Sequence, residues 1–525
     1  MKRTEGAIVG AVALAPFVVF ASFPLPIPAL PAISRDLGVG IADLQLLVSG
    51  YALGLGALLL SGGVLADRFG AARVWIGSML GYAVLSTVCA LADSAPLLVG
   101  ARIGQGAAGA GLLASSLALV ATALPPARRA SAMAVWGAAI GAGLAAGPLG
   151  GGLALETGRW RPAFAALAVI AGLAAGLGAL LLPTAVPTTA VPTRRSRFDL
   201  IGTVTLAGGL GALILAISWA GAGRWTSGRV LTGLGAAALL LAAFVASQRR
   251  RTDPMIDLRI LGRRSYLGGL TAGLTLALSA LSMMVVLGPY AQVVLGGSAL
   301  QVGLWYLPFS GLSFLVALQA ARLGTVLSVR GRLISGLVLS ALGLVALLPI
   351  AADWSWPALL PGLALVGVGV GLANPALGAA AVGGIPPERS GMAAGAANTA
   401  RQLGNALGIV TLAAVLQAAA VGAARDAVHG SGLDTPGLLD RLAGGDLPGA
   451  LAIGGADPSA IAQLYASAQT SGIRLALAVA AVLALLGAAG TALLTRPRPA
   501  AASIPDPIPE PTADPDTVRP HAEVT

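Results

Sequence analysis

Charged residues, cysteine and histidine are all scarce in this sequence of 525 residues. Only 10% of the residues are charged, whereas soluble domains carry about 25%, so the chain has too little charge to cover a water-facing surface. The single cysteine, Cys89, excludes a disulfide framework within the chain. His429 and His521 lie outside the apolar segments, so these segments contain no imidazole that could bind a metal or relay a proton. We therefore expect neither a metal site nor a cofactor.

Long apolar runs are abundant, and the mean hydropathy is +0.86. Windows of about 20 apolar residues recur, which is the length needed to cross ~30 Å of hydrocarbon. We count fourteen of them, at residues 7–30, 44–65, 73–92, 96–121, 131–155, 162–182, 199–219, 228–247, 267–290, 302–321, 333–351, 356–380, 397–420 and 472–494. These windows predict an all-α polytopic membrane protein with fourteen transmembrane helices.

The basic residues are distributed unevenly between alternate connecting segments. Segments on one side of the predicted membrane hold 22 of the 32 Lys and Arg residues, and the alternate segments hold seven. Because basic residues concentrate on the cytoplasmic side of membrane proteins, this asymmetry places both termini in the cytoplasm. The net charge of +11 therefore indicates orientation and does not point to nucleic-acid binding.

The predicted spans fall into groups of six, two and six. Residues 1–182 form an expected N-terminal six-helix bundle, residues 183–265 an inserted helix pair with basic cytoplasmic flanks, and residues 266–494 a C-terminal six-helix bundle. A long external loop is expected at about 421–472, where Asp434 and Asp457 are placed to cap short surface helices. The tail, 495–525, lacks the residues for a core and is expected to be disordered.

The connection after the second span, GGVLADRFGAAR, fits a tight cytoplasmic turn. Gly63 and Gly70 flank an acidic–basic pair in which Asp67 could bond the N-terminal end of a neighbouring helix. Arg68 and Arg73 would face lipid headgroups or a partner acid. This spacing favours a cytoplasmic latch at Asp67 over an ordinary charged loop.

Arg102 lies inside the fourth span, in the run LLVGARIGQGAAGAG. Burying an uncompensated arginine there costs at least ~2.5–3.5 kcal/mol, so we expect it to face a cavity or a polar partner. Gln105 lies one turn further on the same face, and Gly106 follows it. The fragment GQGAAG matches a dinucleotide-binding pattern, but no βαβ unit fits within a span, so that match is rejected.

The fifth span contains GAGLAAGPLGGG, residues 141–152. In lipid, small residues at every fourth position let helix backbones approach closely. Gly143, Gly147 and Gly151 form such a stripe, with Pro148 and Gly152 beside it. The glycines therefore predict a packing and bending face on a helix rather than a loop.

In this order the three motifs resemble those of the major facilitator superfamily, specifically its fourteen-span drug:proton antiporter branch. That family shows G-x-L-a-D-R-x-G-R-[KR] after span two, R-x-x-Q-G on span four and its antiporter motif, G-x-x-x-G-P-x-x-G-G, on span five. The resemblance continues in GRWRPAF at 158–164, in GPYAQVVLG at 288–296 and in NTARQLGNALG at 398–408. It implies that Arg401 and Gln402, in the last of these, belong to a conformational and coupling motif.

The resemblance implies a monomeric exporter of hydrophobic small molecules, drugs or secondary metabolites, in the plasma (inner) membrane. It would need no cofactor and would be coupled to protons. Two six-helix halves would rock around a midplane site. Arg102 and Gln105 would form a polar element of the cavity, and the face from Gly143 to Gly152 would bend against the other half. A leucine at Gly147 should then block transport without lowering abundance.

Two departures from the family pattern concern energy coupling. Ala71 and Ala72 stand where the family's loop motif carries a basic pair. Ser22 and Ile27 stand at the first-span positions where the family usually carries an Asp and an Asn. The loop therefore has fewer basic residues for a charge relay than the family pattern provides. In addition, no acidic residue lies in the middle of a predicted span.

Glu156, at the outer end of the fifth span, is the acid that we expect to carry any coupled proton. It lies close in sequence to Arg159 and Arg161 and could change partners as the halves rock. Arg102 would be the inner positive element.

Several aromatic, amide and methionine side chains within the spans are candidates for substrate contact, although helix packing alone would explain any one of them. They are Tyr51, Trp136, Met283, Met284, Tyr290, Gln292, Trp305, Tyr306 and Asn374. No buried counter-charge for a cation is evident, which favours neutral or lipophilic cargo.

Two alternatives to a coupled exporter stay open. A facilitator that moves lipids or lipophilic metabolites with little proton coupling would explain the missing first-span carboxylate. A membrane enzyme such as a lipid transferase would need paired carboxylates or clustered histidines at a membrane face, and the predicted spans contain neither.

Overall fold

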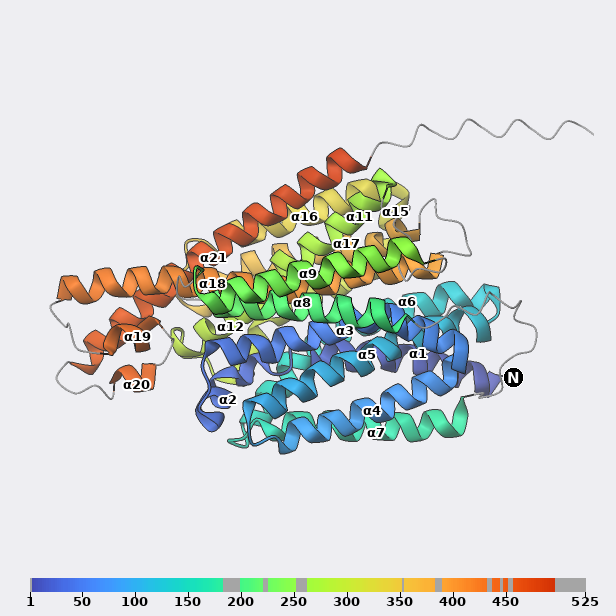
Figure 1. The fold of residues 1–525 in the computed structure, drawn as a ribbon, viewed down its shortest axis with the longest axis horizontal. Helices are drawn as coiled ribbons and strands as arrows, with labels where there is room; N and C mark the ends of the chain where they lie inside the picture. The colour runs from blue at the N-terminus through green and yellow to red at the C-terminus, as the bar shows by residue number, and fades with distance from the viewer. Residues whose placement is uncertain are drawn as a thin grey trace, which may run out of the picture.

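The computed structural model describes residues 2–182, 199–220, 225–251, 262–351, 354–382, 390–431, 437–443, 447–451 and 457–495. These residues are folded into helices joined by short turns, and no strand occurs among them. The helices lie roughly along one long axis (Figure 1). The sequence's fold class, an all-α bundle, is confirmed.

The first half of the bundle runs from α1 to α7. Its helices are α1 (Lys2–Ser22), the 3-10 turn η1 (Ile27–Ala29), α2 (Leu30–Leu37), α3 (Ile41–Phe69), α4 (Ala71–Leu91), α5 (Ala95–Ala123), α6 (Pro126–Leu155) and α7 (Arg161–Leu181).

The second half runs from α11 to α21. Its helices are α11 (Arg264–Leu276), the π-helical turn η3 (Ala277–Leu281), α12 (Met283–Val293), α13 (Ala299–Trp305), α14 (Leu307–Leu318), α15 (Ala320–Val326), α16 (Val329–Ala346), η4 (Trp356–Leu359), α17 (Leu360–Val382), α18 (Ser390–Ser431), α19 (Leu438–Ala443), α20 (Leu447–Leu451) and α21 (Pro458–Leu494).

Twelve helical segments of the described chain are long and apolar enough to cross a membrane. The two remaining windows of the sequence, 44–65 and 131–155, coincide with α3 and α6. In these two helices the apolar stretches found are shorter, Asp43–Leu59 and Ala139–Leu155. A helix therefore lies at every predicted window, whereas fourteen crossings stay a prediction.

Helices α3 and α5 cross with their backbones in contact. A Cβ atom added at Gly62 would lie 2.9 Å from the carbonyl oxygen of Ala110, and one at Gly106 would overlap the carbonyl oxygen of Tyr51. Because no side chain fits between the two helices, Tyr51 of α3 and the polar residues of α5 are held at fixed positions.

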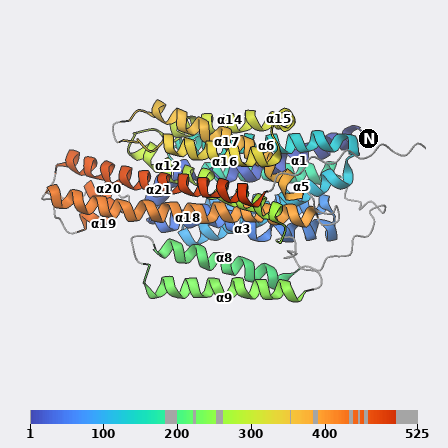
Figure 2. The same ribbon diagram turned by 90° about the horizontal axis from the view of Figure 1, so that it is seen from above.

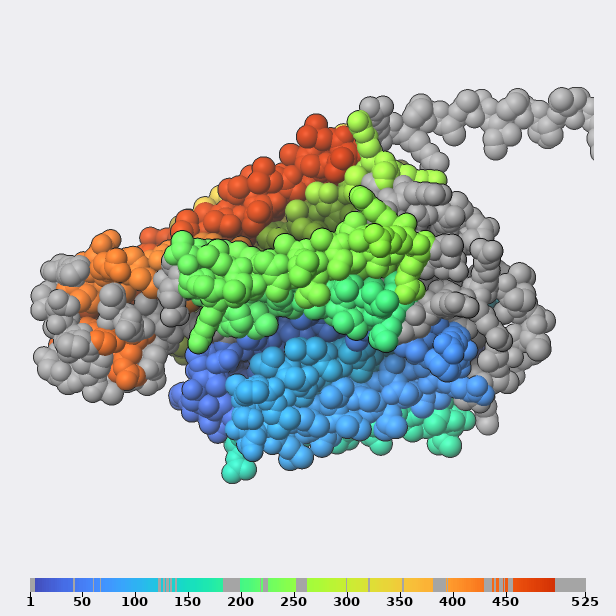
Figure 3. Space-filling model, viewed as in Figure 1, coloured from blue at the N-terminus to red at the C-terminus, as the bar shows by residue number. Residues whose placement is uncertain are grey.

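The inserted pair, α8 (Leu200–Ala220) and α9 (Gly228–Arg250), packs beside both halves (Figure 2). Ile214 of α8 lies in a buried apolar cluster with Ala52 of α3 and Val410 of α18. On one face of the molecule the pair forms a band between the N-terminal half and α21 (Figure 3). The insertion therefore contacts both halves of the bundle.

One buried acid joins the two ends of this pair. The carboxylate of Asp199 accepts hydrogen bonds from the backbone N–H of Gly202, at 2.7 Å, and from the side-chain amide of Gln248, at 2.6 Å. It also lies 3.1 Å from Nη2 of Arg251. Asp199 thus caps the start of α8 and anchors the end of α9, which is a structural role.

The segment expected as a long loop at about 421–472 is largely helical. Helix α18 extends to Ser431 and α21 begins at Pro458, and with α19 and α20 they form a projection at one end of the bundle (Figure 1). Its apolar core includes Val428, Leu442 and Ile461. Asp457 does cap a helix, by accepting the backbone N–H of Ser459, but this helix is the long α21.

Some residues discussed in the sequence analysis lie outside the part of the chain that the structure describes. They are Asp434, the side chains of Asp67 and His429, and the tail beyond residue 495.

Candidate functional site

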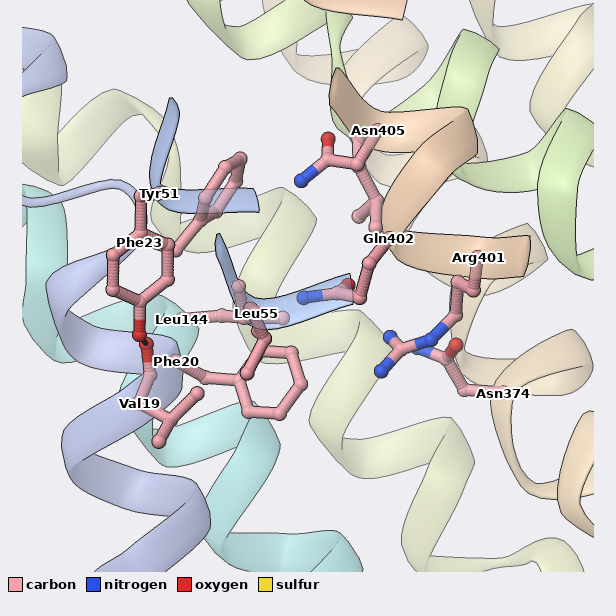
Figure 4. Close-up of a pocket in the computed structure, with 11 residues that line it drawn as sticks. Val19, Phe20, Phe23, Tyr51, Leu55, Leu144, Asn374, Arg401, Gln402 and Asn405 are labelled. Carbon is pink, nitrogen blue, oxygen red and sulfur yellow. Dashed lines mark hydrogen bonds between the residues drawn. The ribbon is translucent and has the colours of Figure 1, made fainter. Parts of the chain in front are cut away.

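A narrow pocket lies between the two halves, and both contribute to its walls (Figure 4). The first half supplies side chains from α1, α3 and α6, and the second half supplies them from η3, α17 and α18. The lining residues are Val19, Phe20, Phe23, Tyr51, Leu55, Leu144, Leu281, Asn374, Arg401, Gln402 and Asn405. An aromatic and aliphatic surface therefore faces a group of amides and one guanidinium.

Arg401 is the one charged residue among these eleven. It is only 9% exposed, and both Nε and Nη2 donate to the side-chain oxygen of Asn398, at 3.1 and 2.7 Å. Its guanidinium carbon lies 5.3 Å from the centre of the Phe20 ring. The ion pairs found in the described chain involve Arg161 and Arg251, so Arg401 faces the pocket without an acidic partner.

Arg102 lies in the first half, behind the aromatic wall of the pocket. It is fully buried, and its Nη1 donates to the hydroxyl of Ser22 at 2.9 Å and to the side-chain oxygen of Gln105 at 3.0 Å. Nε donates to the carbonyl of Leu47, whereas Nη2 is buried without a hydrogen-bond partner in the structure. The expected polar pair of Arg102 and Gln105 is confirmed as a contact, but neither residue lines the pocket.

Tyr51 connects this buried network to the pocket. The guanidinium carbon of Arg102 lies 4.3 Å from the centre of the Tyr51 ring, and the Tyr51 hydroxyl donates to the carbonyl oxygen of Val19 at 2.7 Å. The hydroxyl of Tyr82 lies 3.0 Å from that of Tyr51. The pocket wall on this side is therefore an aromatic ring with a cation on it, a pairing that stabilises the buried charge.

The sequence analysis expected the glycine stripe of α6 to pack against the other half, and this expectation is wrong. A Cβ atom at Gly143 would lie 2.6 Å from the carbonyl oxygen of Phe17, and one at Gly147 would lie 2.6 Å from Pro24 and overlap the carbonyl oxygen of Ala21. These neighbours belong to α1 and the turn that follows it, in the same half. The stripe was misplaced because spacing shows that a helix face is small but does not identify its neighbour.

The rest of the stripe also packs within the first half. Gly151 meets the carbonyl oxygen of Leu25, and Gly152 is buried. Contact with the other half comes instead from the neighbouring face of α6, where the carbonyl oxygen of Pro148 lies 2.9 Å from a Cβ atom built on Gly303 of α13.

The loop motif after α3 forms a one-residue turn. Gly70 has a φ of +90°, which favours glycine, and it separates the end of α3 from the start of α4. Arg68 and Arg73 are exposed, and a Cβ atom added at Gly63 would have no neighbour within 4 Å. The expected tight turn is confirmed, while the latch role of Asp67 stays a prediction because its side chain is not described.

Glu156 and its predicted partners do not come together. Glu156 ends α6 with an exposed side chain that makes no hydrogen bond or ion pair within the described chain. Arg161 instead pairs with Asp36 at 2.5 Å, and Trp160 donates to the same carboxylate at 2.9 Å. The sequence analysis missed Asp36 because this partner precedes Arg161 by 125 positions.

Two of the nine candidates for substrate contact, Tyr51 and Asn374, line the pocket. The other seven lie elsewhere. Met283 and Met284 are buried in the helix core, Tyr306 donates to the carbonyl of Met284 at 2.9 Å, and Tyr290 donates to that of Ala351 at 2.6 Å.

The remaining three candidates also belong to helix packing. Trp136 donates to Ser116 at 3.1 Å, and Trp305 stacks on Trp356 with ring centres 5.8 Å apart. Gln292 is half-buried, away from the pocket.

Sequence reasoning placed Arg401 and Gln402 in a coupling motif, whereas both line the pocket. It missed Phe20, Phe23 and Asn405 altogether. One available signal was the run from Asn398 to Asn405, which places five polar side chains within about two turns of an apolar span.

Comparisons with known proteins match this chain over most of its length. The family model described as Major Facilitator Superfamily matches residues 12–409. The "Multidrug resistance protein Stp" of Mycobacterium tuberculosis (strain CDC 1551 / Oshkosh) is 32% identical over 419 residues, which cover 80% of this chain and 77% of that protein. The "Tetracenomycin C resistance and export protein" of Streptomyces glaucescens is 30% identical over 475 residues, covering 89% of this chain and 87% of that one.

Among solved structures, a bacterial homologue of the human lysosomal transporter Spinster, in an inward-facing and unoccupied conformation, aligns with a TM-score of 0.66. The alignment covers 95% of this chain and 99% of that chain at 15% sequence identity. At this identity the likeness shows a shared fold.

Proposed function

This chain belongs to the Major Facilitator Superfamily, and we propose that it exports hydrophobic small molecules, drugs or secondary metabolites, across the plasma membrane by alternating access. The names of its relatives, which refer to multidrug resistance and to resistance to and export of tetracenomycin C, support this function. The observation that carries it is the pocket, which is bounded by both halves, largely apolar and supplied with a few polar groups.

The way the pocket is built supports alternating access. Phe20 and Leu144 come from one half, and Asn374 and Arg401 come from the other. Rocking the halves would separate these two walls at one end and then at the other, so cargo bound between them would be exposed to each side in turn. The orientation with both termini in the cytoplasm rests on the distribution of basic residues.

A resistance assay with a matched pair of variants tests this function. The chain is expressed in a host that lacks its own efflux pumps, and growth and intracellular accumulation are measured with a panel of lipophilic drugs. Leu144→Ala enlarges the pocket and should change the order of preferred drugs. Leu167→Ala removes the same side chain from α7, also 4% exposed but away from the pocket, and should leave that order unchanged.

Equal drug sensitivity of cells with and without the chain, at normal abundance, would contradict export. An identical change of preference in both variants would show that the pocket does not select the cargo.

For the energy source, we propose proton antiport, which the resemblance to the antiporter branch supports. A second candidate, an exporter driven without protons, is favoured by one observation: none of the eleven described lining residues is acidic. Efflux from proteoliposomes with and without an imposed pH gradient distinguishes the two. Antiport requires that the gradient accelerates efflux, and gradient-independent efflux supports the second candidate.

A further inference from the structure

We propose that the pocket selects organic monoanions, in which an aromatic or aliphatic body carries one carboxylate or similarly ionised group, and that Arg401 binds the charged group. This inference rests on the proposed export function and specifies its substrate class. It departs from the expectation of neutral cargo drawn from the sequence.

The first argument is the uncompensated charge of Arg401. A guanidinium stays protonated in proteins, so this nine-tenths buried side chain brings a full positive charge to the pocket. Its hydrogen bonds within the described chain go to a single neutral oxygen, that of Asn398, and Nη1 makes none. A ligand carboxylate would supply the missing negative charge and a second acceptor for the planar donor group.

The second argument is the distribution of polar and apolar groups around the pocket. Asn374 lies beside Arg401, and Gln402 extends toward the same space from α18 (Figure 4). Phe20 and Leu55 lie on the opposite side, with Leu144 behind them. This division fits an amphiphilic ligand whose charged end meets Arg401 and the amides and whose body lies on the apolar wall.

The third argument excludes cationic cargo. The opposite wall includes Tyr51, whose ring is already engaged by the buried guanidinium of Arg102. The ring of Phe20, on the same apolar wall, lies 5.3 Å from the guanidinium carbon of Arg401 itself. A cation would therefore meet positive charge on both sides and no acid among the described lining residues, so like-charge repulsion opposes its binding.

Equilibrium binding of two isosteric probes tests the inference. Radiolabelled naphthoate, which is ionised at neutral pH, and neutral naphthamide share the same aromatic body. Binding is measured on the full chain in lipid nanodiscs by scintillation proximity. Because only naphthoate brings a negative charge and two carboxylate oxygens to the guanidinium, the parent should bind it about tenfold or more tightly than naphthamide.

Variants of Arg401 assign this preference to one side chain. Arg401→Gln should remove the preference for naphthoate, because the affinity for naphthoate should fall by more than the affinity for naphthamide. Arg401→Lys should keep part of the preference, because the charge remains but the planar donor pair is lost. Arg474→Gln is the control for the same chemical change outside the pocket, since this exposed arginine of α21 donates to the carbonyl of Ile350. Size-exclusion profiles identify any variant that fails to fold. If Arg401→Gln fails, the naphthoate preference of Arg401→Lys is compared with that of the parent instead.

Each outcome decides the inference. Equal or weaker binding of naphthoate by the parent overturns it, and so does a preference that survives in Arg401→Gln. Failure of both probes to bind also overturns it. The export function is judged separately by the resistance assay, so cells protected from neutral drugs without any anion preference would retain the exporter and reject this substrate class.

Discussion

A single methyl group added at either of two glycines of α6 tests how this helix is packed. In Gly147→Ala the new Cβ atom would overlap the carbonyl oxygen of Ala21 and lie 2.6 Å from a ring carbon of Pro24. In Gly150→Ala, three residues later, the new atom would have no neighbour within 4 Å. The two substitutions make the same chemical change on the same helix in opposite surroundings.

The expected difference in stability follows from this geometry. Both variants gain the same helix propensity, up to about 1 kcal/mol, so this contribution cancels between them. What remains is the strain of overpacking at Gly147, about 1–3 kcal/mol. Because the obstacles are a backbone carbonyl and a proline ring, which cannot rotate away, we expect a value in the upper part of this range. The unfolding equilibrium constants should then differ by at least about tenfold.

Denaturant titration of the purified variants in mixed micelles, together with their abundance in membranes, measures this difference. Gly147→Ala should be less stable and less abundant than Gly150→Ala, and its transport per folded molecule should stay near that of the parent. Equal stability of the two variants would refute the packing argument. A stable but inactive Gly147→Ala would restore the interpretation of the stripe as an interface between halves.

Three further predictions follow from other parts of the chain. Gly303→Val should slow transport at normal abundance, because its side chain would collide with the Pro148 carbonyl across the two halves; Gly311→Val, with open space around it, should not. Glu156→Gln should abolish gradient-driven efflux while keeping downhill exchange if Glu156 carries the proton, and unchanged gradient dependence would exclude it. Reporter fusions should read cytoplasmic at Arg195, Arg251 and Pro497 and external at Asp440; a cytoplasmic signal at Asp440 would contradict fourteen spans.

The features that the sequence predicted well are those decided within one or two helical turns. A window of about 20 apolar residues forms a helix wherever it lies, because the backbone in lipid must satisfy its own hydrogen bonds. Gly70 was predicted to allow a tight turn, and its φ is +90°. Arg102 was predicted to face a cavity or a polar partner. Its Nη1 donates to the side-chain oxygen of Gln105, three residues away, at 3.0 Å.

The features that the sequence could not give depend on which helices are neighbours. The stripe at Gly147 was correctly identified as a close-packed face, but its neighbour, α1, is set by the arrangement of the whole bundle. Phe20 and Arg401 share a pocket although they belong to different halves of the bundle and lie far apart in the sequence. Helix packing is a sufficient reason for an aromatic residue in a span, so Trp305 and Phe20 were indistinguishable until their surroundings were known.

An anionic cargo would also change what is needed to drive export. The interior of a cell is electrically negative, so an outward-moving monoanion gains about 2.3 kcal/mol per 100 mV, equivalent to roughly a 50-fold concentration ratio. Arg401 moves with the protein in both directions of the cycle, so one negative charge crosses per cycle. A transporter with a fixed positive charge in its pocket can therefore export a monoanion uphill without any proton-carrying carboxylate, which is consistent with Ser22 and Ile27 at the first-span positions.

Proteoliposomes loaded with naphthoate test this driving force directly. A potassium diffusion potential set with valinomycin should accelerate efflux when the interior is negative and slow it when the interior is positive, at equal pH on both sides. Arg401→Gln should lose the naphthoate flux itself, whereas Arg474→Gln should keep both the flux and its response to the potential. Efflux that follows a pH gradient and ignores the potential would refute the argument, because the energy would then have to enter through a group that binds and releases protons.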